Sequence, residues 1–121
     1  MSSLLDAARR LANHPNWDWR QGMLDQRGGR LVGGSWEHPT VEASGAPPNL
    51  NDGATAGILL QILDETGLLT DVVKHRGDWV VAIDRGDGPI GYAGDSLGEA
   101  AAWALLAVWG EDIARPSLAA G

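Results

Sequence analysis

The histidines are the first residues to test for catalysis or metal binding. They are His14, His38 and His75, and no two lie at the spacing of a metal-binding helical pair. His14 precedes Pro15 and suits a helix cap followed by a turn, whereas His75 suits a solvated strand end. Glu37-His38 is an adjacent acid–base pair, which alone is a weak sign of catalysis. The sequence therefore predicts no catalytic residue, no metal and no cofactor.

Acidic residues dominate the charge of the chain. Its 121 residues include 16 Asp or Glu against 9 Lys or Arg, for a formal net charge of -7, and no cysteine. Binding to a nucleic-acid backbone needs a positive face, so no direct nucleic-acid contact is expected. The missing cysteines exclude a disulfide scaffold and a thiol nucleophile. The doublets Asp64-Glu65 and Glu111-Asp112 predict either a solvated acidic face or a surface that meets a basic partner.

Glycine pairs and arginines are the residues to test for phosphate or nucleotide binding. Gly28-Gly29 and Gly33-Gly34 lack the Gly-x-x-x-x-Gly-Lys-Ser/Thr order of a phosphate-binding loop. A nucleotide-binding alternative would instead need arginines and a tryptophan to converge on one pocket. The arginines in question are Arg20, Arg27 and Arg30.

The tryptophans are the best candidates for a binding surface. Trp17 and Trp19 alternate around Asp18 and precede Arg20, and Trp and Arg are enriched in interface hot spots. In an extended segment, the two tryptophans share one side and Asp18 and Arg20 the other. Either this segment joins Trp36 in an interface, or one of its tryptophans belongs to the core. The candidate protein-binding residues are Trp17, Asp18, Trp19, Arg20, Trp36, Asp64 and Glu65.

These residues must be positioned by helices that the apolar spacing indicates. Apolar side chains recur at intervals of three and four along residues 3–13, 53–66 and 97–109. Asp52 is the expected N-cap of the second helix, and Ser96 with Glu99 forms the capping box of the third.

The remaining segments predict strands. Residues 23–26 and 30–32 resemble a hairpin around Arg27-Gly28-Gly29, and residues 33–49 form a long, mobile loop. Residues 71–75, 79–83 and 90–93 predict further strands, with 79–83 central because it is apolar on both faces. We expect a single α+β domain over residues 1–121, in which three helices cover an antiparallel sheet of about four or five strands. The order is α-β-β-α-β-β-β-α, and residues 111–121 form a frayed tail.

The third helix is apolar around most of its circumference, and this predicts self-association. Ala102, Leu106 and Trp109 lie on the side opposite the stripe expected to face the sheet. We therefore predict a homodimer through the helix at residues 97–109. No apolar run approaches the ~20 residues of a membrane span, and Asp6 and Arg9 interrupt the N-terminal apolar pattern. A cytoplasmic protein without membrane contact is expected.

Three segments resemble a known family. They are Arg9–Pro15, Trp19–Met23 and Asn49–Leu60, and they resemble small uncharacterised tailed-phage and prophage proteins. The second half, Trp79–Trp109, is similar to the phage alpha-beta-alpha sandwich domain. The resemblance implies an accessory protein in an infected or lysogenic bacterial host and no catalytic residue. Gly53 stands where the family usually has proline, which predicts a slightly weaker helix start.

The leading hypothesis is a non-enzymatic phage protein that binds a host or phage protein. In its sharper form, the protein is an anti-defence inhibitor of the anti-CRISPR type, whose carboxylates meet a basic nucleic-acid-binding surface. The alternatives are a sponge for a small ligand or nucleotide, and an enzyme of unknown class.

Overall fold

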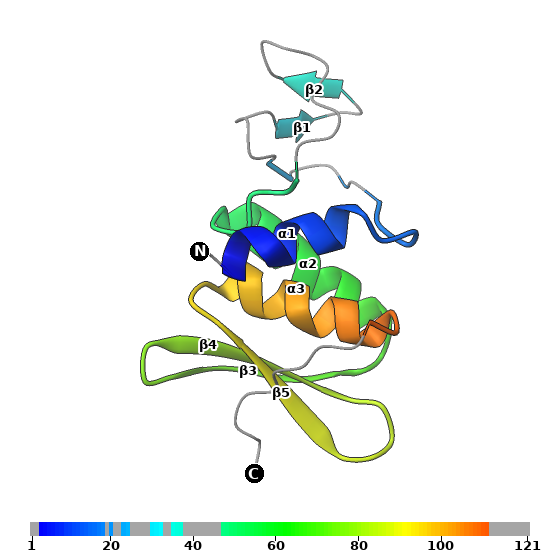
Figure 1. Ribbon diagram of the computed structural model, residues 1–121, viewed down its shortest axis with the longest axis vertical. Helices are drawn as coiled ribbons and strands as arrows, with labels where there is room; N and C mark the ends of the chain where they lie inside the picture. The colour runs from blue at the N-terminus through cyan, green and yellow to red at the C-terminus, as the bar shows by residue number, and fades with distance from the viewer. Residues whose placement is uncertain are drawn as a thin grey trace.

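The computed structural model describes residues 3–18, 20, 23–24, 30–32, 35–37 and 47–111, with the backbone alone at residues 3, 30–32 and 35–37. The helices of this part are α1 (Ser3–Ala12), α2 (Gly53–Glu65) and α3 (Leu97–Val108). The strands are β1 (Arg30–Val32), β2 (Ser35–Glu37), β3 (Leu69–His75), β4 (Asp78–Asp84) and β5 (Pro89–Gly94). Figure 1 shows all of these helices on one side of the sheet that β3, β4 and β5 form. The fold is α+β, as the sequence predicts.

The larger sheet has β4 at its centre, in the antiparallel order β3-β4-β5. Val81 lies opposite Val72 on β3 and Tyr92 on β5. The central position expected for residues 79–83 is thus confirmed. The expected single sheet of four or five strands is not confirmed: among the described strands, β3, β4 and β5 form one sheet, and β1 pairs with β2 in a separate two-stranded sheet.

The hairpin is displaced from its predicted place. Residues 30–32 pair with residues 35–37, and Val32 lies opposite Ser35. Leu24, expected in the partner strand, instead accepts a hydrogen bond from the Asn49 N–H at 2.8 Å. Two glycine pairs flank residues 30–32 and either could turn the chain, so local sequence does not decide between the two registers. Most of the predicted mobile loop, residues 33–49, lies outside the described residues.

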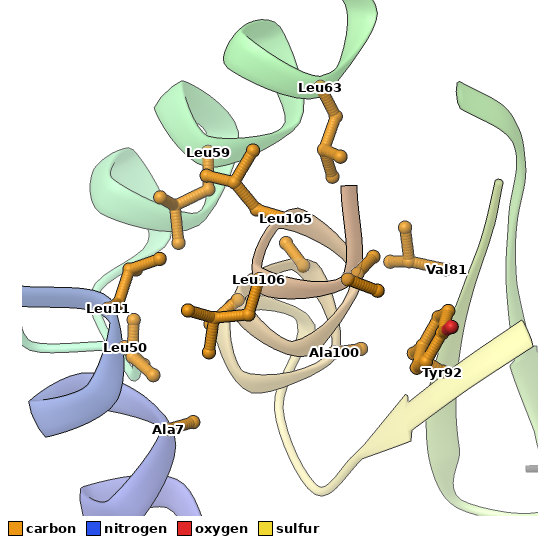
Figure 2. Close-up of a cluster of buried hydrophobic side chains, with 14 of the residues drawn as sticks. Ala7, Leu11, Leu50, Leu59, Leu63, Val81, Tyr92, Ala100, Leu105 and Leu106 are labelled. Atoms are coloured by element: carbon orange, nitrogen blue, oxygen red, sulfur yellow. The ribbon is translucent and has the colours of Figure 1, made fainter. Parts of the chain in front are cut away.

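Helix α3 occupies the middle layer of the domain. One side packs on β4 and β5, and the other side packs on α1 and α2. In Figure 2, Val81 and Tyr92 approach α3 from the sheet, whereas Leu11 and Leu50 lie on the opposite side near Leu106. A helix that is apolar all round is typical of such a buried position.

This placement corrects two expectations. Helix α2 was expected to lie against a sheet because it is apolar, but it packs mainly on α3. Ala102 and Leu106, the side of α3 predicted to pair with a second copy, are fully buried within the chain. The side of α3 that does not face the sheet is therefore covered by α1 and α2. Ala102 and Leu106 are not available to pair with a second copy.

The helix ends carry the predicted caps. Asp52 accepts hydrogen bonds from both the N–H and the hydroxyl of Thr55 at 2.9 Å. Ser96 accepts from the Glu99 N–H at 3.1 Å, and the Glu99 carboxylate accepts from the Asp95 N–H at 3.1 Å. At the other end of α3, Glu111 donates its N–H to the Leu106 carbonyl at 2.9 Å. Glu111 is thus held in a C-terminal cap, although the sequence placed it in a frayed tail.

Candidate functional site

The segment predicted to bind a partner divides between core and surface. Trp17 is half-buried and packs against the hydrophobic core. The backbone N–H of Trp17 donates to the His14 carbonyl at 3.0 Å, and this hydrogen bond closes a turn after α1. Asp18 is exposed, and Trp19 lies outside the described residues. This arrangement supports the interpretation in which one of the two tryptophans belongs to the core.

Arg20 forms a two-point contact with α2. Its guanidinium donates two hydrogen bonds to the carboxylate of Glu65, at 2.9 and 2.7 Å. Glu65 is the last residue of α2, so two patches predicted separately from the sequence meet in one bidentate ion pair. Asp64, its neighbour, is exposed and has no ion pair within the described residues. The Arg20 guanidinium is therefore already paired with a carboxylate of the same chain, which makes it a poor anchor for a nucleotide phosphate.

The Arg20–Glu65 pair predicts an acid-sensitive part of the stability. The hydrogen bonds from Arg20 hold the pKa of Glu65 below its ordinary value of 4.5. Between the folded and unfolded pKa values the unfolded chain binds more protons, so the pair stabilises the fold at neutral pH and this contribution disappears as the pH falls through the folded-state pKa. We expect Arg20→Gln to lose less stability on acidification than the wild type does, as measured by melting temperatures at about pH 7 and pH 3.

Arg9 supplies the control, because it is exposed on α1 and has no ion pair among the described residues. Arg9→Gln should keep the acid sensitivity of the wild type. Equal sensitivity in both variants would contradict a role for the Arg20–Glu65 pair.

The remaining predicted site residues are not brought together in the described part of the chain. Trp36 is placed only as a backbone position of β2. Arg30 is likewise a backbone position of β1, and Arg27 lies outside the described residues. The convergence of arginines and tryptophan required for the nucleotide-binding alternative is therefore not seen.

A cluster that the sequence did not predict joins the ends of α1 and α3. Arg10 lies 3.3 Å from the Glu111 carboxylate and 5.5 Å from the ring centre of Trp103. The His14 ring contacts the Trp109 ring, with 4.9 Å between ring centres. These partners are about a hundred residues apart in sequence, so no local spacing could reveal them. The cluster fastens the first helix to the last.

His14 and Glu111 are the residues in this cluster to examine for acid–base chemistry. His14 Nε2 lies 3.9 Å from Glu111 Oε2, which is beyond hydrogen-bond reach. The other ring nitrogen, Nδ1, accepts the Asn16 N–H at 3.0 Å, and the Glu111 carboxylate faces Arg10. Both groups thus have structural roles. Within the described residues, no group of three His, Asp or Glu side chains could hold a metal ion.

The outer face of the three-stranded sheet, the face turned away from α3, is the surface that sequence reasoning missed. Side chains alternate between faces along a strand. Trp79 and Val72 are on the α3 side and pack against the core, whereas Val80 and Val73 point the other way and are not part of that packing. Val73 is 42% exposed. Within the described part of the chain, no helix or strand covers this outer face.

Lys74 and the aspartates of this sheet lie on opposite faces. Lys74 lies over the Trp79 ring at 5.4 Å, on the α3 side. Arg85, just after β4, donates to the Ala107 carbonyl at 2.8 Å and so turns toward the end of α3.

The outer-face positions carry carboxylates at Asp71, Asp78 and Asp84, with His75 opposite Asp78. The Asp84 carboxylate accepts from the N–H groups of Gly86 and Gly88 in the turn after β4. On β4, Asp78, Val80, Ala82 and Asp84 follow one another at intervals of two residues and so share one face. This spacing was the sequence signal that could have found the surface.

No protein-family model, no curated protein and no solved structure matches this chain. Among the described helices, none has the length and apolar character needed to cross a membrane. What supports a function is therefore the geometry and charge of the surfaces described above.

Proposed function

We propose that this protein is a non-enzymatic binding domain that recruits a basic partner protein through its acidic surface. The observation that carries the proposal is an imbalance in how the charges are used. Within the described residues, most cationic side chains contact another group of the same chain, whereas several exposed carboxylates have no ion pair.

The engaged cations each have an identified partner. Arg10 faces Glu111, Arg20 pairs with Glu65, and Arg85 caps the last turn of α3. Among the arginines whose side chains the structure describes, Arg9 and Arg76 lack such a contact. Because Arg10 and Arg20 are paired with carboxylates and acidic residues outnumber basic ones, the outward potential is negative, which speeds and orients the approach of a basic protein.

In the described part, the exposed carboxylates without an ion pair are spread over the helices, the sheet and the turns. They are Asp6, Asp18, Asp64, Asp71, Asp78, Asp87 and Asp95. With a net charge of -7 over the whole chain, the long-range field has the same sign as this local surface. A basic protein is therefore favoured over a nucleic acid or another acidic protein.

The family resemblance extends this proposal to a biological setting. If the chain is a phage or prophage accessory protein, a basic partner in the bacterial host would include nucleic-acid-binding defence proteins of the kind that anti-CRISPR inhibitors block. In that setting, the acidic surface would occupy the site where the partner binds nucleic acid. The expected consequence is competition, in which this protein displaces nucleic acid from the partner.

The test is capture of a partner followed by a salt titration. The purified chain is used as bait in bacterial lysate, and a captured protein is purified and titrated against it by calorimetry. We expect a basic partner whose Kd rises at least about tenfold between roughly 0.05 and 0.5 M salt, because salt screens exposed charges. A captured partner that is not basic, with a Kd that salt does not change, would contradict the proposal.

A further inference from the structure

We infer that the outer face of the β3-β4-β5 sheet is the docking surface, and that its occupant is a cationic amphipathic helix of the partner protein. This inference rests on the proposed function and adds to it a place on the molecule and a shape for the partner.

The centre of the outer face is apolar across all three strands. Val80 on β4 lies opposite Val73 on β3 and Ala93 on β5, so the three side chains form one row. The next position of β5 on this face is Gly91, where a Cβ atom would come within 2.7 Å of Val80 Cγ1. Because Gly91 has no side chain, the Val80 side chain can lie close to the backbone of β5.

Carboxylates border this apolar row on both sides. Asp71 lies one outer-face position before Val73, and Asp78 lies one position before Val80, on the opposite side of the row because the strands are antiparallel. Successive residues on one face of a strand are about 7 Å apart. A segment lying on the row would therefore have a carboxylate within reach of cationic side chains on either flank.

The width of the sheet indicates the shape of the occupant. The row of Val73, Val80 and Ala93 crosses the three strands, so a helix lying on it is directed across the sheet and covers about 10 Å, or about two helical turns. An amphipathic helix can set one apolar stripe on the row of Val73, Val80 and Ala93. Lysine or arginine beside that stripe would then meet Asp71 and Asp78.

A second copy of the chain fits this face less well than a cationic helix does. Stacking two outer faces would bring Asp71 and Asp78 of each copy toward the same carboxylates of the other. Like charges brought together at an interface weaken association. Charge complementarity thus favours a basic occupant.

The experiment uses a synthetic amphipathic peptide of about 18 residues, long enough to form a helix, with leucine along one face and lysine along the other. Its binding to the full chain is measured by fluorescence anisotropy and mapped by amide NMR shifts. We expect the largest shifts at Val73, Val80, Ala82 and Ala93. A peptide of the same length with glutamate in place of lysine should not bind.

Matched variants separate this face from the overall charge. Asp71→Asn with Asp78→Asn should raise the Kd of the lysine peptide at least about fivefold. Asp6→Asn with Asp64→Asn removes the same charge from α1 and α2 and should change the Kd less than about twofold. Melting curves check that each variant is folded.

A second pair keeps the inference testable should the asparagine variants prove unstable. Val73→Lys adds a cation to the exposed edge of the row and should strongly weaken binding. Gln61→Lys adds the same charge to the exposed side of α2 and should not.

The outcomes distinguish the two proposals. Equal weakening by both double variants, or shifts confined to α2, would overturn the docking surface and leave the acidic binding function standing. A dimer in sedimentation whose shifts map to this face would also overturn it, because the occupant would then be a second copy. Failure of the wild type to bind the lysine peptide at all would count against both.

Discussion

Leu106→Ala is expected to lower the free energy of unfolding by about 2–5 kcal/mol, the range for removing a fully buried leucine. Leu106 has no exposed surface and lies where α1 meets α3. In Figure 2 its side chain is directed toward Leu11 and Leu50. Alanine would leave a cavity between two helices whose backbones are fixed by their other contacts. Chemical denaturation of the purified variant measures the loss.

Leu60→Ala is the matched control for Leu106→Ala. Leu60 lies on α2, is half-buried and contacts the edge of the same core. The same three carbon atoms are removed, but less apolar surface returns to water and no closed cavity forms, so the loss should be clearly smaller. Equal losses in the two variants would contradict the position of α3 at the centre of the domain.

Gly98→Ala is expected to destabilise the protein by about 1–3 kcal/mol, as overpacking of a close contact does. Gly98 is buried in the first turn of α3, where the loop before α2 crosses it. A Cβ atom at this position would overlap the Leu50 carbonyl oxygen and lie 2.9 Å from its carbon. Because these are backbone atoms, relief requires the loop or the helix to move. Such movement would also stretch the 3.3 Å hydrogen bond from the Ser96 hydroxyl to the same carbonyl.

Gly57→Ala provides a control of opposite sign. Gly57 is exposed in the interior of α2, and a Cβ atom there would meet nothing within 4 Å. Alanine is favoured over glycine in a helix by roughly 0.5–1 kcal/mol, so this variant should be more stable than the wild type. Thermal melting of the two alanine variants side by side tests the prediction. A stabilising Gly98→Ala would show that the loop does not cross α3 at this close distance.

The sequence alone determined the helices and the central strand, because their signals are local. Asp52 and Ser96 begin α2 and α3 as expected, since an N-cap needs only a side-chain oxygen within reach of the next turn. Gly67 and Gly110 follow α2 and α3 with positive φ angles of 77° and 95°. The apolar run at residues 79–83 identified the central strand for the same kind of reason.

Only the tertiary structure decided which surfaces are free, because burial depends on partners that are distant in the chain. The apolar side of α3 that suggested a homodimer is covered by α1 and α2. Arg20, a candidate anchor for a partner, is paired with Glu65, 45 residues away. Although β4 is apolar on both faces, its outer face is not covered by any described element. Sequence periodicity specifies which side chains share a face, but whether another layer covers that face depends on how the helices stack, and here all of the described helices stack on the same side of the sheet.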